Sequence, residues 1–142
     1  MKIFFAVFIL FIASSFFSGC TKVGSTAPEN VHQEDQNDDI FPVITIAKPT
    51  DNQVYANGDS IIIEGKSTDN KVMYKGKVIL KNDITSGIVA EQLFETHFLS
   101  VLNFRVAYKA SVTAATDFTI AAEFQDHGLN VSTKTLKVKV NP

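Results

Sequence analysis

The chain has 142 residues and a formal net charge of −2, with 45% hydrophobic and 20% charged residues. Segment 42–142 has the size of one compact domain and carries eleven Lys and Arg residues against ten Asp and Glu residues. This balance argues against nucleic-acid binding, which depends on a basic surface. Cys20 is the only cysteine, so no disulfide bond can form within the chain.

The first 20 residues have the pattern of an export signal. The apolar run from Ile3 to Phe17 is shorter than the ~20 apolar residues that a membrane-spanning helix needs. The small pair Ser18-Gly19 leads into Cys20 and resembles the lipobox at which bacterial lipoproteins are processed. The resemblance implies that residues 1–19 are a signal peptide and that Cys20 is the lipidated N-terminus of the mature protein. The alternative is a secreted protein in which this cysteine is incidental.

Lipidation of Cys20 implies an envelope location and a membrane as the first partner. Each buried methylene of an acyl chain contributes roughly 0.8 kcal/mol, so that a multiply acylated cysteine is a lasting anchor. Thr21 follows the cysteine, whereas an aspartate there is the familiar retention signal of such lipoproteins. We therefore expect a bacterial cell-envelope protein that is lipid-anchored in the outer membrane.

Segment 20–41 is predicted to be an acidic, flexible tether. Between Thr21 and Phe41, a single basic residue, Lys22, stands against five acidic residues: Glu29, Glu34, Asp35, Asp38 and Asp39. Segments of low hydrophobicity and high charge stay unfolded, and a chain of this length spans roughly 25 Å on average. We expect the tether to hold the following domain away from the lipid headgroups.

The domain 42–142 alternates between apolar and polar residues with a period of two, which indicates half-buried β-strands. The predicted strands are Val43–Ala47, Ser60–Gly65, Val72–Lys81, Leu102–Val112, Phe118–Phe124 and Leu136–Val140. Because each strand has one apolar face to cover, we predict an antiparallel sandwich of two sheets. The segment Ile84–Val101 fits either a strand pair or a helical turn, and we expect an irregular crossover with one strand.

Two passages resemble bacterial immunoglobulin-like and cadherin-like surface modules. They run from Pro42 to Asp69 and from Phe118 to Val140, and the turn Asp126–Asn130 joins the last two strands of the resemblance. The resemblance implies an all-β fold, an immunoglobulin-like antiparallel β-sandwich of about seven strands. It is specific for the fold alone, because such sandwiches serve many functions. Short lipoproteins of this build also resemble families described only as domains of unknown function.

One group of residues is a candidate calcium site, since calcium takes oxygen ligands from carboxylates and loops. Asp69, Asn70 and Asp126 meet at one end of the domain if their two loops are neighbours. The alternative is that these residues form Asx turns, in which a side-chain oxygen accepts a hydrogen bond from a nearby backbone N–H. No other cofactor is expected.

A stripe of lysines is a candidate surface for an anionic ligand. The lysines that the resemblance places on one outer face are Lys75, Lys77, Lys81, Lys137 and Lys139. Such a face suits an acidic glycan or an anionic protein. The alternative is that these lysines keep sheet edges from pairing with other chains.

The sequence contains no convergent set of catalytic residues, so an enzyme is not expected. His97 and His127 lie far apart in the sequence and no chemistry is assigned to them. We expect a non-catalytic envelope lipoprotein that displays an immunoglobulin-like module for protein interaction or adhesion. Two alternatives are an accessory glycan-binding lipoprotein and a structural subunit of an envelope assembly.

Overall fold

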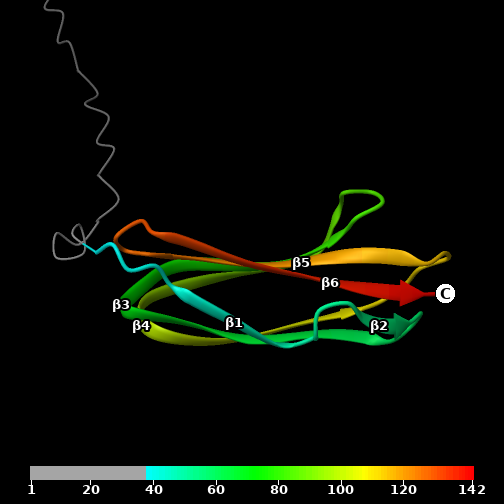
Figure 1. Cartoon of the computed structure of the whole chain (residues 1–142), viewed down its shortest axis with the longest axis horizontal. Helices are drawn as coiled ribbons and strands as arrows, with labels where there is room; N and C mark the ends of the chain where they lie inside the picture. Colours follow the sequence, from blue (N-terminus) through cyan, green and yellow to red (C-terminus); the bar gives the residue numbers. More distant parts are fainter. Residues whose placement is uncertain (1–37) are drawn as a thin grey trace, which may run out of the picture.

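A computed structural model describes residues 38–142, and within them it forms an all-β unit of six strands (Figure 1). The strands are β1 (Val43–Lys48), β2 (Gln53–Ala56), β3 (Ser60–Asn82), β4 (Ile88–Lys109), β5 (Thr116–Asp126) and β6 (Val131–Asn141). The predicted signal peptide, Cys20 and most of the predicted tether lie outside the described residues.

All six strands belong to one mixed sheet that curls around a common interior. The order along the sheet is β1-β3-β5-β6-β2, and β4 pairs with β3. The pairings are antiparallel except for β2 and β6, which are parallel. The predicted all-β class is confirmed. The six strands form one continuous curled sheet, however, where the sequence predicted two sheets and about seven strands.

The long strand β3 joins two predicted strands, Ser60–Gly65 and Val72–Lys81, into one. Its first part pairs with β1 and the end of β4, whereas its second part pairs with β5 and the start of β4. The register shifts between Thr68 and Met73. The extra residues there bend the strand at one end of the molecule (Figure 1).

The bend also changes which residues of β3 face the interior. Ile61 and Ile63 are buried before it, whereas Val78 and Leu80 are buried after it. The buried set therefore moves from odd to even positions, as an extra residue requires in a strand of period two. The two parts of β3 therefore lie on opposite sides of the curl, and both contribute side chains to one core.

The segment Ile84–Val101 contains the one strand that we predicted, but it does not form an irregular crossover. Most of it belongs to β4, which begins at Ile88 and runs antiparallel to β3. The turn between the two strands is organised by Asn82, whose side-chain oxygen accepts hydrogen bonds from the backbone N–H groups of Ile84 (2.9 Å) and Thr85 (3.0 Å). The short strand β2 was also missed.

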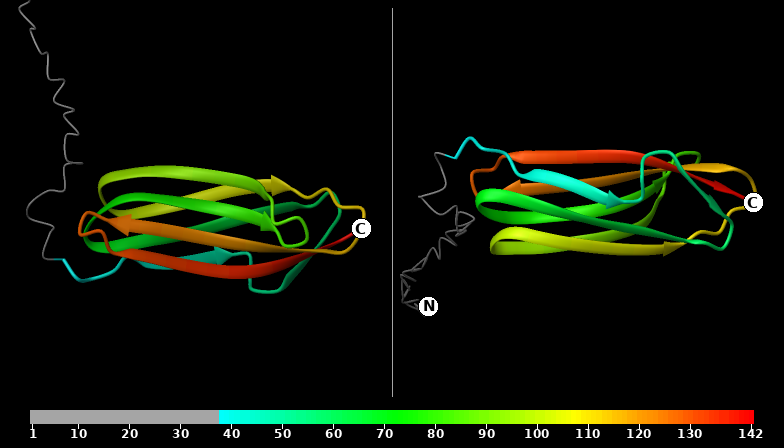
Figure 2. Two further views of the ribbon diagram at one scale, coloured as in Figure 1. Left: turned by 90° about the horizontal axis from the view of Figure 1, so that it is seen from above. Right: turned by 60° about the horizontal axis from the view of Figure 1, so that its bottom comes forward.

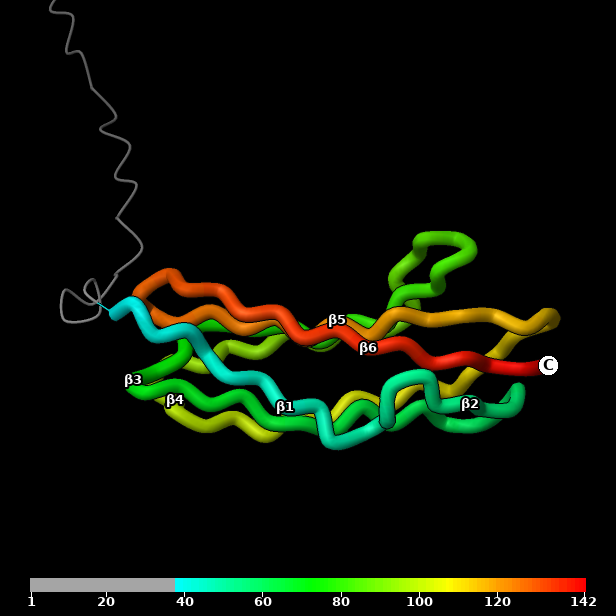
Figure 3. The backbone as a smooth tube through the Cα atoms, viewed as in Figure 1, coloured from blue at the N-terminus to red at the C-terminus, as the bar shows by residue number. Residues whose placement is uncertain are grey.

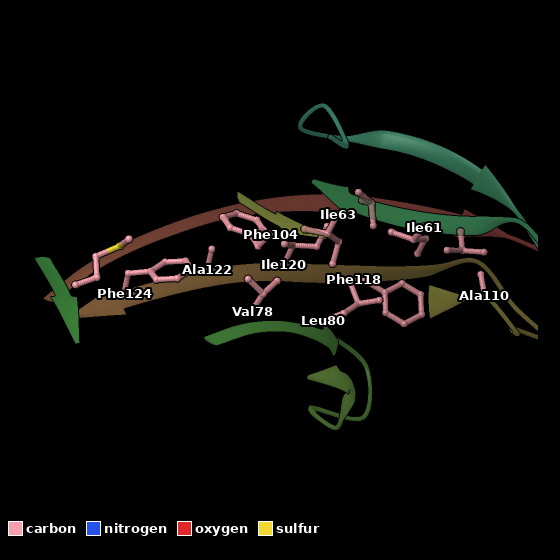
Figure 4. Close-up of a cluster of buried hydrophobic side chains, with 13 residues drawn as sticks. Ile61, Ile63, Val78, Leu80, Phe104, Ala110, Phe118, Ile120, Ala122 and Phe124 are labelled. Carbon is pink, nitrogen blue, oxygen red and sulfur yellow. The ribbon is translucent and has the colours of Figure 1, made fainter. Parts of the chain in front are cut away.

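The core consists of apolar side chains that point into the curl from several strands (Figure 4). The rings of Phe104 and Phe124 stack with their centroids 5.6 Å apart. Two glycines of β3 leave room for these rings, because a Cβ atom on Gly65 would overlap Phe104 and one on Gly76 would overlap Phe124. The two parts of β3 thus close on an aromatic centre.

The two ends of the molecule differ in what they bring together. The start of the described chain, the bend of β3 and β4, and the β5–β6 turn lie at one end, which we call the tether end (Figures 1 and 3). The C-terminus lies at the opposite end, as both views of Figure 2 show. No helix in residues 38–142 is long and apolar enough to cross a membrane.

Candidate functional site

Three carboxylates meet at the tether end. Asp38 precedes β1, Asp69 lies in the bend of β3, and Asp126 is the last residue of β5. One carboxylate oxygen from each lies within 4.8 Å of the others, and we call this group the acidic cluster. The curl of the sheet produces it, since it carries three segments that are distant in the sequence to the same end.

Asp126 is the most deeply buried member, with 1% of its surface exposed. Its side chain accepts hydrogen bonds from the backbone N–H and the side-chain amide of Asn130, both at 2.8 Å. The same amide also donates to the backbone carbonyl of Asp38 at 2.7 Å. Asn130 therefore ties the β5–β6 turn to the beginning of the described chain.

Asp38 is 9% exposed and is held by neighbours on both sides. Its carboxylate accepts hydrogen bonds from the amide of Asn70, at 3.2 and 3.3 Å, and from the backbone N–H of Ile40, at 3.1 Å. The ammonium group of Lys71 lies 3.8 Å from the same carboxylate. A residue that the sequence assigned to the tether is thus part of the folded unit.

The structure brings together two of the three residues that the sequence proposed for calcium. Asp69 and Asp126 are neighbours, whereas Asn70 points its amide nitrogen at Asp38. Asp69 also accepts a hydrogen bond from the N–H of Lys71 at 3.0 Å, as an Asx turn does. Asp38 was missed because the local sequence does not show that it returns to the domain.

The acidic cluster has the ligand chemistry of a hard cation site. Its oxygen atoms are separated by up to 4.8 Å, which is about twice the calcium–oxygen distance of roughly 2.4 Å. The arrangement can accommodate a divalent cation between three carboxylates. Without a cation, the same arrangement places three negative charges together with one nearby lysine, Lys71.

An aromatic cluster containing two histidines also forms near the bend. The ring of Tyr74 lies 4.8 Å from that of His97 and 5.2 Å from that of His127, and the two imidazoles are 5.3 Å apart. His127 is 4% exposed. No sequence pattern connects the two histidines, because β4 and the β5–β6 turn meet only through the curl of the sheet.

The predicted lysine stripe is interrupted by carboxylates. Lys77 pairs with Glu123 at 3.1 Å. Lys137 pairs with Asp83 at 3.0 Å, and Lys139 lies 3.9 Å from Asp117. The stripe is therefore a surface of mixed charge at these three positions.

The other two lysines of the stripe have different neighbours. The ammonium group of Lys75 lies 4.8 Å from the ring centroid of Tyr74, within cation–π range. Lys81 is half-buried, and its positive charge favours the ionised form of Asp83. The hydroxyl of Thr119 donates to Asp83 at 2.7 Å, and this bond, with Lys137 beside it, holds the pKa of Asp83 below its usual value.

Strand β4 runs along one side of the molecule (Figure 2, left), and many of its side chains are exposed. Its exposed large apolar residues are Ile88 (55%), Leu93 (62%), Phe98 (74%), Leu99 (44%) and Val101 (50%). In residues 38–142, β4 pairs with β3 alone, so that its other edge is open. We did not predict this strand edge from the sequence, because exposed leucines and a phenylalanine obscure the alternation of polar and apolar residues in the strand.

Comparison of the chain with known proteins identified no relative. No family model matches the chain, and no curated protein matches it.

Proposed function

We propose that the chain is a non-catalytic cell-envelope lipoprotein. It is anchored through Cys20 and displays its β-sheet domain for protein interaction or adhesion. The open edge of β4 is the observation that carries the interaction part of the proposal. Its 22 residues include five exposed large apolar side chains. Strand edges of this kind bind another chain by adding a strand, with backbone hydrogen bonds and side-chain contacts contributing together.

The anchoring part of the proposal rests on the leader and on the position of the tether end. The lipobox resemblance at Ser18-Gly19-Cys20 supplies the anchor. The described chain starts at the tether end, whereas the loop 110–115 lies at the opposite end with the C-terminus (Figure 1). A domain attached in this way presents its long sides and its far end to other molecules.

We also propose that the fold is a divergent relative of the immunoglobulin-like sandwich. Two features support this: an antiparallel β5–β6 hairpin with its turn at residues 127–130, and a core shared by strands on opposite sides of the curl. The glycan-binding alternative depends on the lysine stripe, where three lysines already contact carboxylates. Protein interaction is therefore the proposal that we favour.

Anchoring is tested with the full chain and its Cys20→Ala variant expressed in a bacterial host. We expect the wild-type chain to be processed at Cys20 and to partition into the detergent phase. The Cys20→Ala variant should remain unprocessed or partition into the aqueous phase. Equal detergent partitioning of two processed proteins would contradict lipid anchoring, and Ser18→Ala is the matched control, since a small residue is kept before the cysteine.

A further inference from the structure

The open edge of β4 is much longer than the other two edges of the sheet. Strand β4 has 22 residues, whereas the other edge strands, β1 and β2, have six and four. Natural sheets shield exposed edges with proline, with charges that point inward or with a covering segment. β4 contains no proline, and within residues 38–142 no other strand pairs with its free edge.

Charges are distributed unevenly along the exposed face of β4. Two acidic residues, Glu91 and Glu95, precede Ser100, and two basic residues, Arg105 and Lys109, follow it. All four are exposed and occupy odd positions. The other exposed odd positions hold no Asp, Glu, Lys or Arg residue: Leu93, His97, Leu99, Val101, Asn103 and Ala107. One half of the face is thus acidic and the other half is basic.

We propose that β4 pairs antiparallel with the β4 strand of a second copy, about a two-fold axis at Ser100. Such an axis places each residue opposite the one that lies equally far on the other side of Ser100. Glu91 then faces Lys109, and Glu95 faces Arg105. Because the axis repeats every contact, the dimer has four pairs of opposite charge. Opposite charges that face each other across strands stabilise their pairing.

The same register also matches the apolar residues. Leu93 faces Ala107, and Leu99 and Val101 lie on either side of the axis, close to Phe98, whose φ of 70° interrupts the extended backbone. If the axis is moved by one residue, to Leu99 or to Val101, neither glutamate lies opposite a basic residue. Parallel pairing in register would place like charges opposite each other, which destabilises a sheet. The sequence of β4 therefore favours one orientation and one register.

The shape of β4 permits this pairing along both of its halves. The strand bends with β3 at the tether end, so that its two halves lie along the same side of the molecule (Figures 1 and 2). A two-fold axis that runs lengthwise through the bend brings the first half of one strand beside the second half of its partner. The interface is closed, since the β4 edges of both copies are covered and neither is left to pair with a third β4 strand.

The charged groups retain capacity for a second partner. Arg105 donates through Nε to Glu64 at 3.1 Å, and its terminal nitrogens supply further donors. The carboxylate of Glu95 lies 3.7 Å from Nε2 of His97 and is 79% exposed. In residues 38–142, neither Glu91 nor Lys109 belongs to an ion pair. All four can therefore turn toward a neighbouring strand.

This pairing rests on the proposed function only in taking β4 as the interaction surface, and it does not require a lipid on Cys20. The test uses two variants of the full chain in detergent solution. Glu91→Lys/Glu95→Lys makes the face of β4 wholly basic, and Arg105→Glu/Lys109→Glu makes it wholly acidic. Sedimentation velocity over a concentration series measures dimerisation of each protein alone and of a 1:1 mixture.

We expect the wild-type chain to dimerise reversibly and each variant to dimerise about tenfold or more weakly, because four attractive pairs become repulsive. The mixture should regain dimers, since basic and acidic strands complement each other in the same register. A wild-type chain that stays monomeric, or variants that dimerise as strongly as wild type, would overturn the proposal. Circular dichroism melts show whether both variants are folded.

A cysteine at the axis gives an independent measurement of the register. In the Ser100→Cys variant, the two new thiols lie directly opposite each other, and mild oxidation should join the two copies. In the Ala107→Cys variant, each thiol faces Leu93 of the partner, so no such product is expected. Equal cross-linking of the two variants would exclude the register centred on Ser100, even if the charge variants failed to fold. The outcome is separable from anchoring, which detergent partitioning of Cys20→Ala reports.

Discussion

Replacing Asp69 with asparagine tests whether charge repulsion within the acidic cluster destabilises the fold. The substitution keeps the shape of the side chain and the oxygen that accepts the N–H of Lys71, but it removes one of three neighbouring charges. Two unit charges 4.8 Å apart repel by about 3.5 kcal/mol at an effective dielectric constant of about 20, and by about 0.9 kcal/mol in water. Lys71 offsets part of this repulsion.

In the presence of a chelator, we therefore expect Asp69→Asn to raise the free energy of unfolding by about 1–3 kcal/mol. The melting temperature should rise by at least about 5 °C in a domain of this size. Thermal melts followed by circular dichroism measure this change. Asp117→Asn is the matched control, because Asp117 is exposed and its nearest cation, Lys139, is 3.9 Å away. A lower melting temperature for Asp69→Asn would refute the reasoning and assign Asp69 to the turn alone.

The same melts with calcium separate two roles of the acidic cluster. A cation that binds the native state alone raises the melting temperature by mass action. A rise in the wild-type protein that is lost in Asp69→Asn assigns a cation site to Asp38, Asp69 and Asp126. Equal melting temperatures with and without calcium leave the Asx-turn interpretation.

Two further predictions concern the core and the response to acid. Gly76→Ala should lower the free energy of unfolding by about 1–3 kcal/mol, because the new methyl group overlaps Phe124. Gly87→Ala is the control, since its methyl group meets only the flexible side chain of Thr85. Equal urea midpoints for the two variants would contradict this packing. The lowered pKa of Asp83 stabilises the fold above pH ~4 and the contribution is lost as the pH falls through the folded-state pKa. Thr119→Val should therefore weaken the loss of stability in acid, and an unchanged pH profile of the melting temperature would contradict the role of its hydroxyl.

The parts of the fold that the sequence predicted are those in which alternation is regular. β5 buries Phe118, Ile120, Ala122 and Phe124 on one face, and the turn residues 127–130 separate it from β6. Regular alternation with a marked turn specifies a hairpin without knowledge of the rest of the chain. Alternation predicted Phe118–Phe124 and Leu136–Val140 as strands, the second of which covers only the later part of β6, and the resemblance supplied the turn between them.

The sequence failed where tertiary structure interrupts the pattern. The bend between Thr68 and Met73 shifts the alternation of β3, so that one strand was read as two. In β4, exposed Leu93 and Phe98 are apolar at positions where a surface strand is expected to be polar. A period-two pattern reports the burial of side chains, and it cannot reveal an apolar edge that faces outward.

The acidic cluster was predicted in part for a similar reason. Asp69 and Asp126 each stand beside turn-forming residues, which placed them in loops. Asp38 is recognisable only from its contacts with Asn70 and Asn130, which are separated from it by 32 and 92 residues. Contacts over such distances depend on the curl of the whole sheet, and no local pattern encodes them.

The interaction claim is tested most directly by photo-cross-linking in intact cells. A photo-reactive amino acid is placed at Leu93, on the face of β4, or at Thr113, an exposed control position in the loop between β4 and β5. The account predicts a discrete covalent protein adduct from Leu93 in the membrane fraction, and little or none from Thr113. Adduct formation from Thr113 with none from Leu93 would contradict the claim that the open edge of β4 is the binding surface.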